Sequence, residues 1–359
     1  MTENQAAANT TADASIEMKE TAGLSQGQLV LKRFLRHRGA NISLAYLALL
    51  ILFVFTAGGI HLGSREMPIT IPGWWHLTIN DMSEVSISNS DSGQLLVGAP
   101  TLDLNPFDGN GVHVGAHPFG QDAIGHDYFA LVIRGAQQSI MVMLVVGLIG
   151  GLMGTVIGAV SGYFRGLTDS ILMRFTDLII TIPTVIIGSV IGAKFGNLGV
   201  FPLAIFLGLF AWTGLARLVR GEFLSLRERE FVDAARVAGA SAGRIIFKHI
   251  LPNAMGVIIV SVTLLLSGAI LLETALSYVG FGVQSPDVSL GTLISQYQDS
   301  FQASPWLFWW PGFFIISIAL SVNFIGDGLR DAFDPRQKRQ IKRKDFLAKT
   351  STRDAVNKR

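Results

Sequence analysis

Residues 225–253, SLREREFVDAARVAGASAGRIIFKHILPN, form a polar interruption between two apolar segments of the chain. Ser225 and Glu228 have the S-x-x-E spacing of a capping box, which predicts the start of a helix. Four apolar residues follow at the spacing of one helical face: Phe231, Ala234, Ala235 and Ala238. We expect Gly239 to end this helix, because glycine readily adopts the left-handed conformation that closes many helices.

A second short helix is expected after Ser241, which is a favourable N-cap residue. Its apolar positions are three isoleucines: Ile245, Ile246 and Ile250. Leu251-Pro252 marks the change into the next apolar run, since proline is disfavoured inside a helix. Residues 225–253 are therefore predicted to form two short helices with one narrow, alanine-lined face, and we call this segment the hook.

The composition of the 359-residue chain is that of an integral membrane protein. Half of its residues are hydrophobic, 15% are charged, and the mean hydropathy is +0.45. Six apolar runs match a hydrocarbon core of about 30 Å when folded as helices. These runs cover residues 43–60, 139–163, 178–192, 200–216, 254–272 and 306–325. We predict an all-α protein with six transmembrane helices. For the first run, an uncleaved span is expected and a signal peptide is the alternative, because the run begins far from Met1 and no A-x-A-like cleavage site follows.

The polar segments divide the chain into domains. Residues 1–40 and 337–359 are predicted tails, and residues 41–60 form the first span. Residues 61–138 are predicted to form an extramembrane insert with a few short strands and a closing surface helix. Residues 139–336 are the core with the other five spans. Four glycines in the second run predict the close approach of a neighbouring helix: Gly150, Gly154, Gly158 and Gly162.

The basic residues indicate the orientation of the spans. Seven Lys and Arg residues lie between the fourth and fifth runs, and eleven lie from residue 330 onwards. Residues 61–127 contain only Arg65, and residues 280–305 contain no Lys or Arg. By the positive-inside rule, both termini and the hook face the cytoplasm and the insert faces outward. A multi-pass protein of the cell membrane is expected.

Motifs for energy conversion and catalysis are absent from the sequence. No Gly-Lys dipeptide occurs, so there is no P-loop, and H-E-x-x-H is absent as well. The lack of Cys excludes thiolate metal sites. His113, His117 and His126 lie in the insert, where surface or packing roles are favoured over a metal site. Energy is therefore expected to arrive from a partner through the hook.

Ionisable residues are scarce in the predicted spans, which is unlike most ion-coupled transporters. Glu273 is expected near the outer interface, as a packed carboxylate with a structural partner. Arg174 and Asp177 are expected to form an i,i+3 ion pair at the inner interface. Neither feature predicts an ion pathway.

The hook resembles the EAA loop of ABC importer permeases. The family pattern is Glu-Ala-Ala, three residues, Gly, nine residues, Ile, one residue, and Leu-Pro. The matching residues are Asp233, Ala234, Ala235, Gly239, Leu251 and Pro252. Asp233 replaces the usual Glu, and His249 replaces the Ile. The resemblance implies that this loop, with Glu230 at the start of its moving part, couples the permease to an ATPase subunit.

Other stretches narrow the resemblance to the C-type, or second, permease subunit of the dipeptide, oligopeptide and nickel family. Residues 117–127 resemble the HPFGTDxxGRD segment of that family, with Gln121 and His126 in place of Thr and Arg. Residues 272–282 and 323–335 resemble the stretches after the fifth helix and at the end of the sixth. The matching blocks extend over roughly residues 30–336 and leave an unexpectedly long insert, residues 62–112.

The resemblance implies a heteromeric importer with the type I permease fold. Its other parts would be a sister permease subunit, two ABC ATPase subunits that hold ATP and Mg²⁺, and an extracytoplasmic substrate-binding protein. The chain itself would be neither an enzyme nor a holder of cofactor, metal or nucleic acid. Closure of the ATPase would move residues 230–251 and tilt the fifth helix through Pro252. Gly239 would permit the turn, and Ala234 and Ala235 would allow close approach to the partner.

Several alternatives stay open at this point. Peptides are the expected cargo, and nickel or another small solute is the alternative for the same machinery. An ion-coupled transporter or channel, or a membrane scaffold, would be a different class of protein, and the scarcity of deep charges argues against the first of these. The sequence does not specify the path-lining side chains, the role of the insert or the presence of an outer membrane.

Overall fold

The computed structural model describes residues 26–62, 69–89, 95–103 and 113–333. The predicted tail 337–359, residues 1–25 of the first tail and part of the insert lie outside the described residues. Within the segment predicted as a polar tail, α2 (Gln26–Phe34) is a helix. It packs on the end of α13 (Trp306–Phe333) through buried Phe34 and Ala332, because Val30 and Phe34 share one of its faces.

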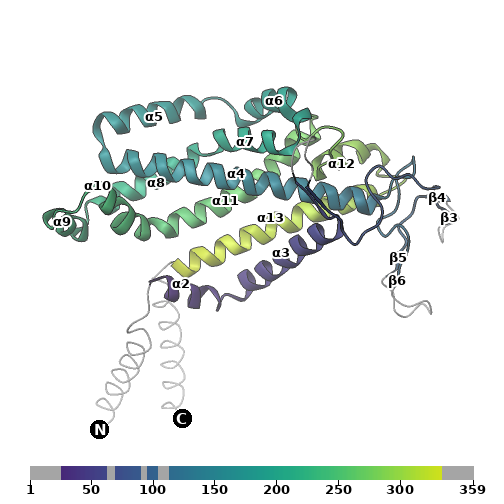
Figure 1. Ribbon diagram of the computed structural model, residues 1–359, viewed down its shortest axis with the longest axis horizontal. Helices are drawn as coiled ribbons and strands as arrows, with labels where there is room; N and C mark the ends of the chain where they lie inside the picture. Colours follow the sequence, from purple (N-terminus) through teal and green to yellow (C-terminus); the bar gives the residue numbers. More distant parts are fainter. Residues whose placement is uncertain (1–25, 63–68, 90–94, 104–112, 334–359) are drawn as a thin grey trace, which may run out of the picture.

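Long helices lie side by side along the molecule (Figure 1). Among the described residues, five helical stretches are long and apolar enough to cross a membrane, and a bent pair adds a sixth span. In chain order the spans are α3 (Arg38–Ala57), α4 (Tyr128–Phe164), α5 with α6 (Gly166–Ile180 and Thr184–Phe195), α7 with α8 (Val200–Ala211 and Thr213–Arg227), the stretch Ala242–Tyr278, and α13. The predicted all-α fold with six spans is confirmed.

Helix α4 lies at the centre of the bundle and packs on α7, α8 and α11 (Leu251–Tyr278). Residues 128–139 are its first turns and not a separate surface helix, because buried apolar side chains such as Val132 and Ile140 continue along it. The glycine stripe lies in close contact with neighbouring helices, as predicted: Gly154, Gly158 and Gly162 face α8, and Gly150 faces α7 and α11. A Cβ on Gly158 would lie 2.5 Å from the carbonyl oxygen of Ala216, so only glycine permits this close packing.

The third span is broken, with α5 and α6 bent by 74° around Pro183. The predicted ion pair of Arg174 with Asp177 is wrong, because Asp177 binds Arg217 on α8 at 2.5 Å. Helix α8 also supplies Arg220, whose Nε and Nη2 donate to the two oxygens of Asp169 on α5 at 2.6 Å. The acidic residues of α5 therefore find their basic partners on the neighbouring helix α8 and not within α5, where the i,i+3 spacing had placed them.

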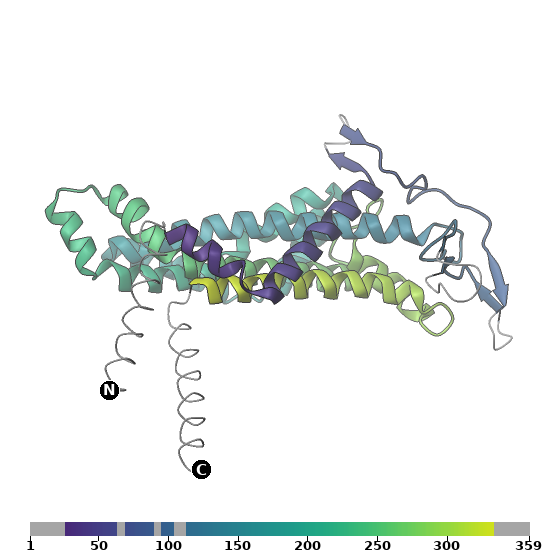
Figure 2. The same cartoon turned by 90° about the horizontal axis from the view of Figure 1, so that it is seen from below.

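The described part of the insert contains three two-stranded antiparallel hairpins, which confirms the short predicted strands. They pair β1 (Ile60–Leu62) with β2 (Ile69–Ile71), β3 (Ile87–Asn89) with β4 (Leu95–Val97), and β5 (Leu102–Asp103) with β6 (His113–Val114). The short helix α12 (Leu290–Tyr297) lies near this end, and the hook projects from the opposite end (Figures 1 and 2).

Candidate functional site

The first helix of the hook is α9 (Glu230–Val237), and it does not begin at the predicted capping box. Ser225 lies in the last turns of α8, which continues to Arg227 because Phe223 is fully buried against α4. Glu228 forms an ion pair with Arg165 at 2.7 Å instead of capping a helix. Tertiary packing thus overrides the local S-x-x-E signal.

The face by which α9 packs differs from the predicted one. Its buried side chains are Val232 and Ala235, whereas Phe231, Ala234 and Ala238 are exposed. Ala235 is 9% exposed and packs in one apolar cluster with Ile245, whereas the close approach of Ala234 and Ala235 to a partner stays a prediction.

The outer surface of α9 is left partly apolar. Phe231 is 39% exposed and Val237 is 91% exposed, with Ala234 also at the surface. Glu230 and Asp233 are exposed on the same short helix, and Asp233 forms an ion pair with Arg236 at 2.8 Å. Apolar side chains edged by charges are typical of a surface that meets another protein.

Gly239 ends α9, as predicted. Its φ is +75°, and Ala240 N–H donates to the carbonyl oxygen of Ala235 at 3.0 Å while Gly239 N–H donates to that of Arg236 at 2.9 Å. This pair of bonds is a Schellman motif, which needs a left-handed residue at this position. Beyond the two neighbouring residues, no heavy atom of the described residues lies within 4 Å of a Cβ built on Gly239, so the backbone conformation alone requires glycine.

The second half of the hook is continuous with the fifth span. Ser241 caps α10 (Ala242–Arg244), which passes through the π-helical η2 (Ile245–Ile250) into α11 without a break. We call the continuous helix Ala242–Tyr278 the rod. The three predicted isoleucines are buried: Ile245, Ile246 and Ile250.

The π-helical segment explains how Pro252 fits into the rod. Leu251 N–H donates to Ile246, five residues back, so the turn before Pro252 is wider than an α-turn. The side chain of Asn253 donates to the carbonyl oxygen of half-buried His249 at 2.6 Å. Pro252 is therefore accommodated inside a continuous helix. The second hook helix and the fifth span, which were predicted to change over at Leu251-Pro252, form one helical stretch.

A dense hydrogen-bond network at the opposite end was not predicted. We call it the outer clasp, after the outward orientation predicted from the basic residues: residues 117–127 with Trp75, Ser83 and Tyr297. Asp127 Oδ1 lies 2.9 Å from His117 Nδ1, while its Oδ2 accepts from Trp75 Nε1 at 2.8 Å and from Ala130 N–H at the start of α4. His117 Nε2 contacts Ser83 Oγ at 3.2 Å.

The two residues that depart from the family segment, Gln121 and His126, both take part in the clasp. Gln121 Nε2 donates to Ser83 Oγ at 2.8 Å, and its Oε1 accepts from Ser86 N–H at 3.0 Å. His126 Nδ1 lies 2.8 Å from Asp122 Oδ2. Within the described residues, no group of three or more His, Asp or Glu side chains is arranged to hold a metal ion.

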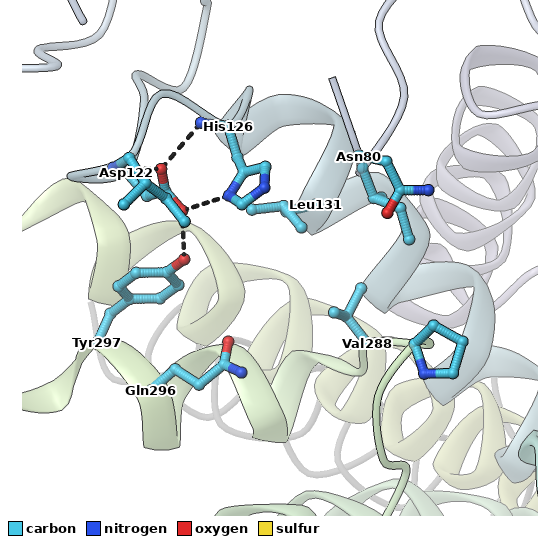
Figure 3. Close-up of a pocket in the computed structure, with 10 residues that line it drawn as sticks. Asn80, Asp122, His126, Leu131, Val288, Gln296 and Tyr297 are labelled. Atoms are coloured by element: carbon cyan, nitrogen blue, oxygen red, sulfur yellow. Dashed lines mark hydrogen bonds and ion pairs between the residues drawn. The ribbon is translucent and has the colours of Figure 1, made fainter. Parts of the chain in front are cut away.

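Asp122 lies at the wall of a cavity of about 300 Å³ beside α12 (Figure 3). Burial by itself would raise the pKa of Asp122, but hydrogen bonds from His126, Tyr297 and Ile124 N–H outweigh it and lower the pKa below its ordinary value. Burial, then the charge of Asp122, raises the pKa of Tyr297. The carboxylate therefore stays ionised and joins α12 to the segment before α4.

These features define the class of the protein. Six spans, a hook at one end and an elaborated opposite end are those of a multi-pass membrane protein with the type I ABC importer permease fold. The chain belongs to the family described as the binding-protein-dependent transport system inner membrane component, which matches residues 154–339. Residues 25–64 match a second family description, the N-terminal transmembrane domain of oligopeptide transport permease C. As a permease subunit, the chain is not itself an enzyme.

Curated relatives extend over nearly the whole chain. An "Oligopeptide transport system permease protein OppC" of Mycobacterium tuberculosis is 37% identical over 312 residues, 87% of this chain and 95% of the relative. Proteins of the same name from Haemophilus influenzae and Escherichia coli are 36% and 35% identical, each over 90% of this chain and over 93% and 95% of the relative.

Proposed function

We propose that this chain is the transmembrane permease subunit of an ATP-driven, binding-protein-dependent importer of di- and oligopeptides. The observation that carries the proposal is the 35–37% identity, over about nine-tenths of the chain, to relatives named as oligopeptide transport permeases. Related chains of this length and identity share one fold, and the hook supplies the feature by which such a subunit receives energy.

The complex that we propose has a sister permease, two ABC ATPase subunits and an extracytoplasmic substrate-binding protein. ATP and Mg²⁺ belong to the ATPase subunits, because the sequence of this chain has no P-loop. We orient both termini and the hook toward the cytoplasm, since the basic residues concentrate in the hook and after α13. The insert then faces outward, toward the binding protein.

The hook is the proposed contact with one ATPase subunit. Phe231, Ala234 and Val237 offer apolar contact area, while Glu230 and Asp233 add charge beside it. Gly239 returns the chain to the rod, and the buried contacts of Val232 and Ala235 hold α9 against η2. Movement of α9 with the ATPase would therefore reach His249, Leu251 and Pro252 and act on the rod as a whole.

The test uses the complete complex in sealed vesicles with the binding protein and a labelled short peptide on the outer side. We expect peptide uptake that requires ATP and the binding protein. Vesicles that receive ⁶³Ni²⁺ instead of peptide on the outer side report on the alternative cargo. Nickel uptake without peptide uptake would overturn the assignment of cargo, and uptake of peptide without ATP would overturn the assignment of an ATP-driven importer.

A further inference from the structure

A buried carboxylate in the rod joins three elements near the outer end. Glu273 on α11 is 0% exposed, and its prediction as a packed carboxylate with a structural partner is confirmed. Ser277 Oγ, one turn further along α11, donates to Oε1 at 2.7 Å. Ser139 Oγ on α4 donates to Oε2 at 2.8 Å. Each carboxylate oxygen thus holds a hydroxyl from a different helix.

The same hydroxyls hold α12. Ser289 is the N-cap of α12, and its Oγ donates to Ser277 Oγ at 3.0 Å. Leu290 N–H donates to Ser139 Oγ at 3.4 Å. We call Glu273, Ser139, Ser277 and Ser289 the Glu273 joint. It links α11 and α4 to the first turn of α12 by directional bonds.

The fit of α12 against the rod leaves little freedom at this joint. A Cβ on Gly291 would lie 2.6 Å from the carbonyl oxygen of Thr274, so the backbones of α12 and α11 are in close contact. Ser295 Oγ near the other end of α12 donates to the carbonyl oxygen of Tyr278 at 2.7 Å. A displacement of the outer end of the rod would therefore carry α12 with it.

Helix α12 also reaches the outer clasp. Tyr297, its last residue, donates from its hydroxyl to Asp122 Oδ2 at 2.9 Å. The rod spans 37 residues, roughly 55 Å at the rise of an α-helix, with the hook at one end and the joint near the other. A continuous series of contacts thus runs from the hook through the rod, the joint and α12 to the clasp. Figure 1 shows α9 of the hook and α12 near opposite ends of the molecule.

The hydrogen-bonding groups of the joint indicate that the Glu273 side chain positions neighbouring helices and does not only fill space. The hydrogen-bond partners of the Glu273 side chain are hydroxyls, with no Lys or Arg among them in the described residues. An apolar side chain of similar size would fill the space without the desolvation cost of a carboxylate. Unlike an apolar side chain, the carboxylate accepts directional hydrogen bonds from two helices at once, α4 and α11.

We propose that Glu273 is a positioning residue that fixes α12 to the rod, so that movement of the hook displaces the outer clasp and opens the outer end of the permease. This role rests on the proposed function, because it uses the ATPase stroke that the hook receives. It assigns the transmission of the stroke across the membrane to a hydrogen-bonded joint and not to bending at Pro252.

The test measures peptide taken up per ATP hydrolysed by the complete complex in vesicles. Glu273→Ala removes both bonds, and we expect this ratio to fall about tenfold, since α12 then loses its directional link to the rod. Glu273→Gln keeps the shape and can exchange bonds with the same hydroxyls, so we expect it to restore most of the ratio. Thr274→Val is the matched control, because the buried Thr274 Oγ1 makes no hydrogen bond within the described residues.

Two further measurements keep the outcome clear. Ser289→Ala removes the bond to Ser277 Oγ and the N-cap bond from Thr292 N–H, but it keeps Glu273 and the bond of Leu290 N–H to Ser139. We therefore expect a smaller fall in the ratio and a small fall in the thermal unfolding temperature. Spin labels at exposed Gln296 on α12 and Leu144 on α4 should change their separation on ATP binding in the wild type and less so in Ser289→Ala.

An unchanged ratio in both Glu273→Ala and Ser289→Ala would overturn the proposal, as would a Glu273→Gln variant as defective as Glu273→Ala. If Glu273→Ala does not assemble, Ser289→Ala decides alone. Wild-type vesicles separate this inference from the proposed function. Failure of wild-type uptake counts against the importer, whereas normal uptake with unaffected variants counts against the joint alone.

Discussion

In the hook, α9 is held to the rod by buried Val232 and Ala235, and within the described residues no α9 side chain donates or accepts a hydrogen bond to another element. In the outer clasp, Asp127 alone accepts bonds from His117, Trp75 and Ala130. Apolar contacts are non-directional, whereas a network of charged hydrogen bonds specifies one geometry. Under the proposed function, α9 is thus held to the rod by contacts that allow small adjustments as the two move together, whereas the clasp keeps one shape.

The largest expected effect, on unfolding free energy, concerns the outer clasp. Asp127→Ala leaves His117 and Trp75 Nε1 without their buried partner and removes the N-cap bond to Ala130. Because several charge-assisted bonds and a cap are lost together, we expect a loss of about 3–5 kcal/mol in unfolding free energy. Thermal unfolding in detergent measures it. Ser86→Ala, which keeps the backbone bond to Gln121, is the control, and an equal loss in both would contradict the central role of Asp127.

The next prediction separates the two faces of α9. Ala235→Arg places a charge among Val232, Ile245 and Ile246, so we expect α9 to detach from η2 at a cost of about 3 kcal/mol. Ala234→Arg changes an exposed position and should leave unfolding unchanged while weakening ATPase binding. Limited proteolysis at the hook and co-purification of the ATPase distinguish the pair. Equal protease sensitivity of the two variants would contradict the orientation of α9.

The third prediction concerns the turn after α9. Gly239→Val forces a β-branched residue to φ +75°, which costs about 1–2 kcal/mol and should unwind the Schellman motif. We expect peptide uptake to fall strongly while ATP hydrolysis continues. Gly243→Val is the matched control, since Gly243 is exposed, has no positive φ and leaves open space for a Cβ. Loss of uptake in the control alone would contradict this account.

Local signals predicted part of the hook. Gly239 and the buried isoleucines were correct because a left-handed turn and an apolar face depend on neighbouring residues. The start of α9 was wrong because Phe223 packs against α4, a contact between residues far apart in sequence. The exposed faces of α9 were also misassigned, since the two-turn helix offers several faces and only the position of η2 selects the buried one.

The clasp could not be predicted from spacing. Tyr297 meets Asp122 across 175 residues, and Ser83 meets His117 across 34. The resemblance of residues 117–127 to a family segment marked the region but gave no partners. The predicted pairing of Arg174 failed for the same reason, because α8 supplied a basic residue that no local pattern contained. Hydropathy, in contrast, predicted the six spans, since lipid imposes length and composition on each of them.

The smallest expected effect concerns the contact between α12 and the clasp. Tyr297→Phe removes one bond to Asp122, and we expect a loss of about 1 kcal/mol at neutral pH. Asp122 has a lowered pKa in the fold, so its stabilisation is complete above the ordinary Asp value of about 3.9 and disappears as the pH falls through the lower folded value. In Tyr297→Phe, the pKa of Asp122 in the folded protein rises toward the ordinary value. The variant therefore loses less free energy of unfolding on acidification than the wild type, and the difference in stability between the two shrinks below about pH 4. Thermal unfolding at pH 7 and pH 3 measures this, with Tyr278→Phe as the surface control. A gap between Tyr297→Phe and wild type that stays constant with pH would show that the hydroxyl acts through packing and not through the carboxylate.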